Sequence, residues 1–189
     1  MGNLTPVIIP STGSGPQRCA TGQDLLAIAA LGTAARQPVT QQDMRDAIEE
    51  IAGHLWVPAF DSLQAVVERL LRRGQLVASG GQAAHYLTTS SGLERLCRLL
   101  ALDYSHPGCL ISQVGMRLGM AFLDLIPAPR RRGYLQSSLH HCDRQLREWQ
   151  RRSALCRAQG ALGRRWLDQD GRRLGQERHM LQAMLADLA

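Results

Sequence analysis

The sequence contains no lysine, because all 22 of its basic residues are arginine. This absence excludes a phosphate-binding P-loop, which requires a lysine, and any reaction through a Schiff base on a lysine amine. The five cysteines include no C-x-x-C pair, so neither a zinc knuckle nor a disulfide framework is expected. Such cysteine usage is typical of a reducing compartment, and we expect the protein to be cytoplasmic.

Long hydrophobic runs are also missing. No apolar stretch approaches the ~18 residues that a membrane span needs. No arginine precedes an apolar stretch near the N-terminus, as a secretory signal would require. We therefore expect a soluble protein without a membrane partner. Hydrophobic residues still make up 44% of the chain, which is enough to bury a core.

The excess of positive over negative charge is confined to the second half of the chain. Residues 1–100 hold eight arginines and eight acids, whereas residues 101–189 hold fourteen arginines and eight acids. The net charge of +6 therefore comes entirely from the second half. A positive field attracts nucleic acid or acidic partners. The alternative is a solvated helix surface with arginines in i,i+4 pairs.

The N-terminal half begins with a segment of low structural propensity and continues with helix signals. Residues 1–20 hold three prolines and three glycines, which predicts a mobile arm. Thr21 precedes Asp24, and Thr40 precedes Asp43, at the spacing of a capping box. Two helices are expected from these starts, the second ending at Gly53. Asp61 is predicted to cap a third helix, which ends at Gly74.

An extended segment follows these helices. Two short strands, 75–79 and 83–88, flank Gly80-Gly81, which is a strong hairpin signal. Thr89, Ser90 and Ser91 then offer N-caps for a fourth helix. Helix, helix, helix, hairpin, helix is the order of a winged helix-turn-helix domain. Two short strands cannot form an independent sheet, so they must pack on the helices.

The remainder of the chain is predicted to be helical. A helix near 109–126 is interrupted by Pro127 and Pro129, a long helix runs from about 130 to 159, and a last helix follows Gly160. The long helix carries a heptad seam, the spacing that one helix needs to lie against another. Such a thin helical layer buries little surface, so we predict a homodimer. The expected interface residues are Leu135, Leu139, Cys142, Leu146, Trp149, Trp166, Leu181 and Leu185.

The predicted fold class is therefore mainly α. It consists of a mobile arm over residues 1–20, a winged helix-turn-helix DNA-binding domain over 21–103 and an all-helical dimerisation region over 104–189. The winged domain contains three helices and a short two-stranded wing.

Residues 22–102 resemble the PadR family of transcriptional regulators. The stretch 61–74 (DSLQAVVERLLRRG) fits the recognition helix of that family, and 86–92 (YLTTSSG) resembles its Y-x-L-T-x-x-G step out of the wing. The helices that follow resemble its dimerisation region. Two features depart from the family pattern: Gln64-Ala65 stand where it usually has Tyr-Pro, and the wing segment 80–84 is uncharged. The resemblance implies a DNA-binding regulator.

The third helix supplies most of the predicted DNA contacts. With Leu63, Val66, Val67 and Leu70 turned inward, its outer residues are Ser62, Gln64, Ala65, Glu68, Arg69, Arg72 and Arg73. Gln64 suits an adenine edge and Ala65 a thymine methyl group, whereas Ser62 and the three arginines suit phosphates. Further predicted contacts are Thr40, Gln41 and Gln42 at the preceding helix and His85 on the wing. The alternative is that each is an ordinary exposed residue.

Other ligands have weaker support in the sequence. His140-His141-Cys142 are adjacent on a helix and point about 100° apart, so they do not converge on one ion, and we expect no metal and no cofactor. Members of the resembled family often accept flat aromatic or amphipathic effectors near the dimer interface. Trp149 and Trp166 are candidates for a pocket that binds a small aromatic effector. The alternative is that both indoles are plain interface anchors.

The sequence thus predicts a sequence-specific DNA-binding regulator, a repressor, that acts as a homodimer on a palindromic operator and responds to a small effector. The alternative is a winged-helix module that binds protein partners and does not read DNA, which the neutral N-terminal half and the uncharged wing favour. An enzyme is not expected, because no catalytic triad, carboxylate pair or metal spacing stands out.

Overall fold

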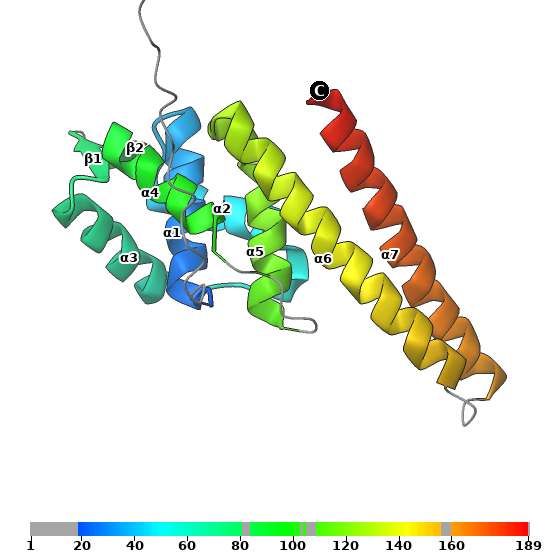
Figure 1. Cartoon of the computed structure of the whole chain (residues 1–189). Helices are drawn as coiled ribbons and strands as arrows, with labels where there is room; N and C mark the ends of the chain where they lie inside the picture. The colour runs from blue at the N-terminus through cyan, green and yellow to red at the C-terminus, as the bar shows by residue number, and fades with distance from the viewer. Residues whose placement is uncertain (1–18, 81–83, 103, 105–108, 156–159, 189) are drawn as a thin grey trace, which may run out of the picture.

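The computed structural model describes residues 19–80, 84–102, 104, 109–155 and 160–188. Figure 1 shows two parts: α1 to α5 gather with a small wing, and α6 and α7 form a long hairpin beside them. The elements in chain order are α1 (Gly22–Arg36), α2 (Gln41–Ala52), η1 (Gly53–Leu55), α3 (Phe60–Arg72), β1 (Leu76–Ser79), β2 (His85–Thr88), α4 (Ser90–Leu100), α5 (Leu110–Ala121), η2 (Leu123–Leu125), α6 (Ala128–Leu155) and α7 (Ala161–Asp187). The mainly helical winged-helix fold predicted from the sequence is confirmed.

Local capping signals fix where most of the short helices begin. Both predicted capping boxes are present: the Asp24 carboxylate accepts from the Thr21 backbone N–H at 3.0 Å, and Asp43 accepts from Thr40 at 2.7 Å. Thr89 caps α4 by accepting from the backbone N–H of Gly92 at 3.1 Å. Each bond satisfies a helix-terminal donor that would otherwise be unpaired.

The start of α3 differs from the prediction. Asp61 is not its N-cap: the helix begins at Phe60, and Ala59 occupies the N-cap position without a side-chain hydrogen bond. Asp61 instead lies in the first turn, where a carboxylate interacts favourably with the positive end of the helix dipole. The prediction was wrong because an aspartate is favourable both at the N-cap and in the first turn of a helix, so its presence does not say which position it occupies.

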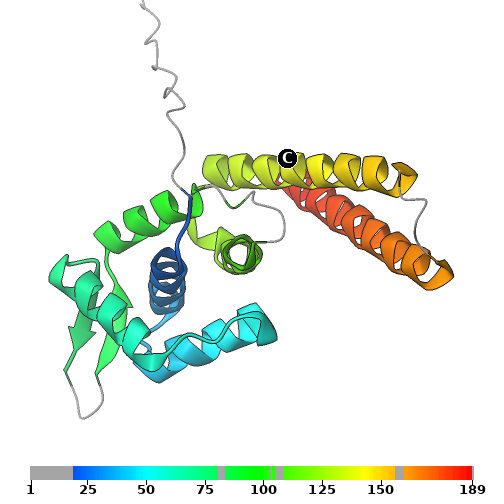
Figure 2. The same ribbon diagram turned by 90° about the horizontal axis from the view of Figure 1, so that it is seen from below.

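Helix α1 forms the centre of the winged domain. It contacts α2, α3, α4, α5 and β2, and Figure 2 shows it enclosed by its neighbours. Leu25, Ile28 and Leu31 are fully buried on it, and Leu26 and several alanines are buried beside them. A helix that is apolar on all sides is stable only inside a core. The same core continues through α5 to Ile126.

The wing is tied to the helices by its backbone. β1 and β2 are antiparallel, with Leu76 opposite Thr88, and Val39 exchanges two backbone hydrogen bonds with Tyr86, at 3.1 and 2.8 Å. The Thr88 hydroxyl donates to the carbonyl of Leu31 at 2.7 Å. A Cβ at Gly92 would overlap the Gln75 carbonyl oxygen, so the step from the wing into α4 requires glycine. The predicted turn at Gly80-Gly81 extends outside the described residues.

The heptad seam of α6 lies against another helix, as predicted, and that helix is α7 of the same chain. Leu135, Cys142 and Leu181 are at most 1% exposed within one chain. The Trp149 indole N–H donates to the Leu167 carbonyl at 2.8 Å, and its ring covers Gly171. Leu139, Leu146, Trp149 and Leu185 are half-buried, whereas Trp166 is 74% exposed.

α7 begins directly after Gly160, as predicted, whereas α6 differs slightly in extent from the prediction. α6 begins at Ala128, two residues before the expected residue 130. Pro129 does not prevent this start, because the first turn of a helix has no use for the backbone N–H that proline lacks. The expected end near residue 159 falls outside the described residues. Among the described helices, none is both long and apolar enough to cross a membrane.

Candidate nucleic-acid interface

The burial of α3 defines its free face. Leu63, Val66, Val67 and Leu70 are at most 3% exposed and fix the rotation of the helix on the core. These four buried residues are the ones that the sequence predicted to face inward. Of the predicted contacts, Ser62, Gln64, Ala65, Glu68, Arg72 and Arg73 are exposed, and Arg69 is half-buried.

Three predicted contacts are linked on the surface of α3. The Gln64 amide donates to the Glu68 carboxylate at 3.0 Å, and the Arg72 guanidinium lies 3.9 Å from the same carboxylate. Exposed i,i+4 pairs of this kind contribute little to stability. Gln64 and Arg72 are therefore free to exchange Glu68 for another partner at small cost.

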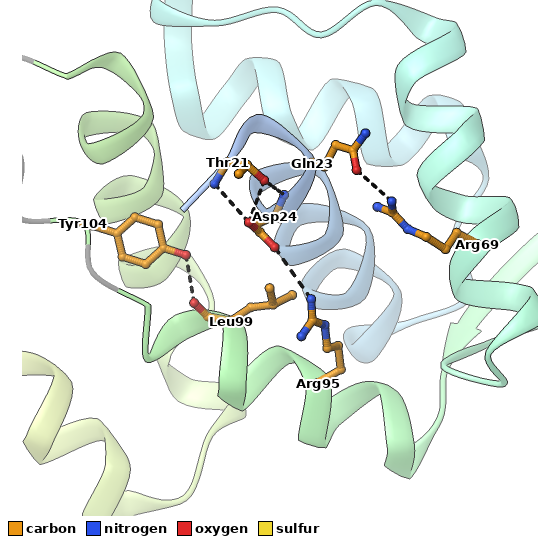
Figure 3. A network of polar contacts seen from close by, with 7 residues as sticks. All are labelled: Thr21, Gln23, Asp24, Arg69, Arg95, Leu99 and Tyr104. Carbon is orange, nitrogen blue, oxygen red and sulfur yellow. Dashed lines mark hydrogen bonds and ion pairs between the residues drawn. The ribbon is translucent and has the colours of Figure 1, made fainter. Parts of the chain in front are cut away.

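Arg69 is oriented by the first helix. Its Nη1 donates to Oε1 of Gln23 at 2.8 Å, across the boundary between α3 and α1 (Figure 3). The next residue on α1, Asp24, is buried and lies 3.7 Å from the guanidinium of Arg95 on α4. The start of α1 thus contacts α3 through Gln23 and α4 through Asp24. A guanidinium has five donors, so Arg69 keeps donors for a phosphate while it binds Gln23.

The predicted contacts at the start of α2 are engaged in local structure. The Thr40 hydroxyl donates to Asp43 at 2.8 Å, and Gln42 donates to Asp46 at 2.7 Å. The backbone N–H and the hydroxyl of Thr40 lower the pKa of Asp43, which keeps a negative charge at this helix start. The Gln41 side-chain nitrogen is buried and has no hydrogen-bond partner among the described residues.

His85 lies exposed at the start of β2, opposite Ser79. The Ser79 hydroxyl is 3.4 Å from the His85 carbonyl, so the two strands remain linked at this end of the described wing. Residues 81–83, which connect the strands, fall outside the described residues. A charge on His85 contributes to lowering the pKa of Asp43, so this end of the wing lies near the start of α2.

A cavity of about 510 Å³ opens between α4, α5 and α6. Leu100, Leu102, Met116 and Ile126 contribute apolar surface, and Arg98, Arg130 and His141 are its basic lining residues. None of its lining residues in the described structure is acidic. Trp149 and Trp166, which the sequence suggested for an effector pocket, do not line it. No sequence pattern indicated this cavity, because its walls come from three separate helices.

Comparison with known proteins identifies the class of this chain. The family model for AphA-like transcriptional regulators matches residues 17–185. The chain belongs to this family. The AphA-like match confirms the predicted class, a transcriptional regulator. No curated protein matches the chain.

Solved structures similar to this AphA-like chain include PadR of Bacillus subtilis with operator DNA, at 17% identity, TM-score 0.40, 87% of this chain and 99% of that one. PadR of Bacillus subtilis with p-coumaric acid is 16% identical, with a TM-score of 0.40, and the match covers 90% of this chain and 98% of that one. A PadR-like regulator of Bacillus cereus has 15% identity, TM-score 0.40, and coverage of 86% and 97%.

Proposed function

We propose that this AphA-like regulator is a homodimeric repressor that reads a palindromic operator with α3 in the major groove. The observation that carries the proposal is the exposed face of α3. Its N-terminal half presents Ser62, Gln64 and Ala65, and its C-terminal end presents Arg72 and Arg73. Recognition helices place N-terminal residues on base edges and use basic residues for the backbone.

The proposed division of roles follows from side-chain chemistry. Gln64 leaves Glu68 and pairs with an adenine edge, while Ala65 contacts a thymine methyl group. Glu68 then accepts from a cytosine amino group. Arg69, Arg72 and Arg73 bind phosphates, as Ser62 does at the helix start. Further contacts to the DNA backbone are proposed for Thr40, Gln41, Gln42 and His85. To make such a contact, Thr40 must give up part of its hydrogen bonding to Asp43.

Exposed apolar side chains near both ends of one side of α7 support a homodimer. Leu162 is 80% exposed and Trp166, one turn later, is 74% exposed. Met180 follows Trp166 by two heptads and is 49% exposed, so it lies on the same side of the helix. Large exposed apolar groups of this kind mark association surfaces. We assign this face to a second copy of the chain.

The predicted interface residues then have two roles. Leu135, Cys142 and Leu181 are buried in one chain, so they act by holding α6 to α7. Trp166 acts by contacting the second copy. Leu139, Leu146, Trp149 and Leu185 are half-buried, and we propose that they complete the support beneath the contact face.

The cavity between α4, α5 and α6 is the proposed effector site. Arg98, Arg130 and His141 favour an anion, and the apolar remainder favours a hydrophobic body, so the expected effector is a small amphipathic anion. The cavity wall on α4 lies close in sequence to Arg95, which pairs with Asp24. We propose that effector binding shifts α4, alters the start of α1 and thereby moves α3 off the operator.

A mobility-shift assay on the DNA upstream of the protein's own gene tests this function. We expect the wild type to prefer a palindrome in that DNA over random duplex, and Gln64→Ala to lose the preference. Glu50→Gln, on the exposed side of α2, is the matched control because it lies outside the proposed contacts. Equal affinity for all duplexes, together with a stoichiometric protein partner retained by Arg69→Ala and Arg72→Ala, would instead support the protein-interaction module.

A further inference from the structure

A cysteine thiol forms part of the cavity wall. Cys97 lies on α4 one turn before Ala101, and both residues line the cavity, so this face of α4 is turned toward it. The side chain of Cys97 is partly exposed. A thiol in this position can meet a ligand that enters the cavity.

The other described cysteines lie in different environments. Cys142 is buried, its thiol lies 3.3 Å from the Leu174 carbonyl, and burial raises its pKa to about 11, with the nearby Glu177 and Asp143 adding to the effect. Cys109 is exposed at the start of α5, where the backbone N–H groups of Ser112 and Ile111 lower the pKa of its thiol. Cys19 is exposed near the start of the described residues. Among these four thiols, Cys97 is the one that lines the cavity.

Two further features are polar groups on residues that line the cavity. Tyr134 also lines it, and the Tyr134 hydroxyl is buried without a hydrogen-bond partner in the described structure. A buried unpaired hydroxyl is costly unless a ligand or water satisfies it. Arg98 and Arg130 are exposed lining residues, so both guanidinium groups are accessible to an entering anion.

We propose that Cys97 is a covalent modification site for small anionic electrophiles, namely carboxylate-bearing enones or quinones. The Cys97 sulfur forms a bond to the β-carbon of the conjugated carbonyl compound. The π electrons move to the carbonyl oxygen as an enolate, and the proton lost by the thiol ends on the α-carbon. No oxidant, reductant or further reactant is needed. The arginines hold the carboxylate while the electrophilic carbon faces the thiol.

The regulatory consequence rests on the proposed function. An adduct on Cys97 occupies the cavity and presses on α4, the helix that contacts Asp24 through Arg95. The adduct is therefore expected to weaken operator binding. The site itself does not depend on that outcome, because its chemistry is measurable without DNA.

The test compares two maleimides of similar size on the full chain, neutral N-ethylmaleimide and anionic 3-maleimidopropionate. Because the chain has no lysine, these reagents have little else than thiols to modify. Peptide mass spectrometry gives the rate at each cysteine. At Cys97 we expect the anionic reagent to react faster than the neutral one by about fivefold, the size of one solvent-exposed ion pair. At the exposed Cys109 the ratio should stay close to that of a free cysteine peptide.

Two variants and one condition make the outcome specific. Arg98→Gln and Arg130→Gln should each reduce the anionic preference at Cys97 while the Cys109 ratio is unchanged. Raising the salt concentration should reduce the same preference in the wild-type protein. This test does not depend on whether a variant folds. A Cys97 ratio equal to that of Cys109, or a failure of Cys97 to react, would overturn the site.

Operator binding is measured separately on the labelled protein. We expect labelling with 3-maleimidopropionate to lower the affinity of the wild type for the duplex. The Cys97→Ser variant should bind the duplex with nearly the same affinity with and without the reagent. An adduct on Cys97 with unchanged duplex affinity would overturn the regulatory consequence but not the site. Absence of operator binding before labelling would instead contradict the proposed function.

Discussion

Arg69 on α3 donates from Nη1 to Oε1 of Gln23 on α1 at 2.8 Å, although the two residues are 46 positions apart. The bond connects the proposed reading helix to the first residues of the central helix. Asp24, the neighbour of Gln23, is itself held by Arg95 of α4. The direction of the Arg69 side chain therefore depends on two other helices.

Arg69→Ala should weaken duplex binding for all sequences alike, because the residue is proposed to bind phosphate. The slope of log affinity against log salt concentration should become shallower by about one. Gln23→Ala should keep the slope, since it leaves the charge of Arg69 in place. Affinities measured at several salt concentrations check both variants. An unchanged slope for Arg69→Ala would show that this guanidinium does not reach the DNA backbone.

Gly92→Ala should destabilise the winged domain by about 1–3 kcal/mol, the usual cost of overpacking. The added Cβ would overlap the Gln75 carbonyl oxygen at the step from the wing into α4. Gly22→Ala is the control, because nothing lies within 4 Å of a Cβ there. Urea denaturation should give a lower midpoint for the first variant and no loss for the second. Equal midpoints would contradict the close approach at Gly92.

Much of this architecture could be predicted from short-range signals. The Thr21–Asp24 and Thr40–Asp43 capping boxes lie within single turns, and Gly53 and Thr89 end or begin helices by their own chemistry. The inward set of α3 followed from its period alone. Signals of this kind need no knowledge of the rest of the chain.

Features that depend on tertiary packing were not predictable in the same way. The seam of α6 indicated contact with a helix, but spacing does not say whether that helix belongs to the same chain, and here it is α7. Trp149 was suggested for an effector pocket, and its indole instead bonds to Leu167. The cavity brings together Cys97 and His141, which no local pattern relates.

Trp166→Ala should shift the protein from dimer to monomer and leave its fold intact, because the indole is 74% exposed within one chain. Leu181→Ala is the contrasting variant, since Leu181 is fully buried and its truncation should cost about 2–5 kcal/mol of stability. Sedimentation velocity reports the mass, and thermal unfolding reports the stability. A Trp166→Ala protein that remains dimeric would place the interface elsewhere.

The Asp43 capping box makes a pH-dependent contribution to stability. Hydrogen bonds from Thr40 lower the folded-state pKa of Asp43 below 3.8, so the unfolded state binds the proton more readily. The stabilisation is present above pH 3.8 and is lost as the pH falls through the lower folded value. Asp43→Asn should therefore be less stable than the wild type at neutral pH, with the difference shrinking in acid. Urea midpoints from neutral to strongly acidic pH check this, and a constant difference would contradict it.

The central claim is that the outer face of α3 reads DNA from both subunits of a dimer. Its most direct test is titration of the wild type onto one duplex that carries the upstream palindrome and onto a scrambled duplex of equal length, at several salt concentrations. We predict two chains bound per palindrome, tighter binding to the palindrome at every salt concentration, and affinity that falls steeply as salt rises. Equal affinity for both duplexes, or one chain per site, would contradict the account.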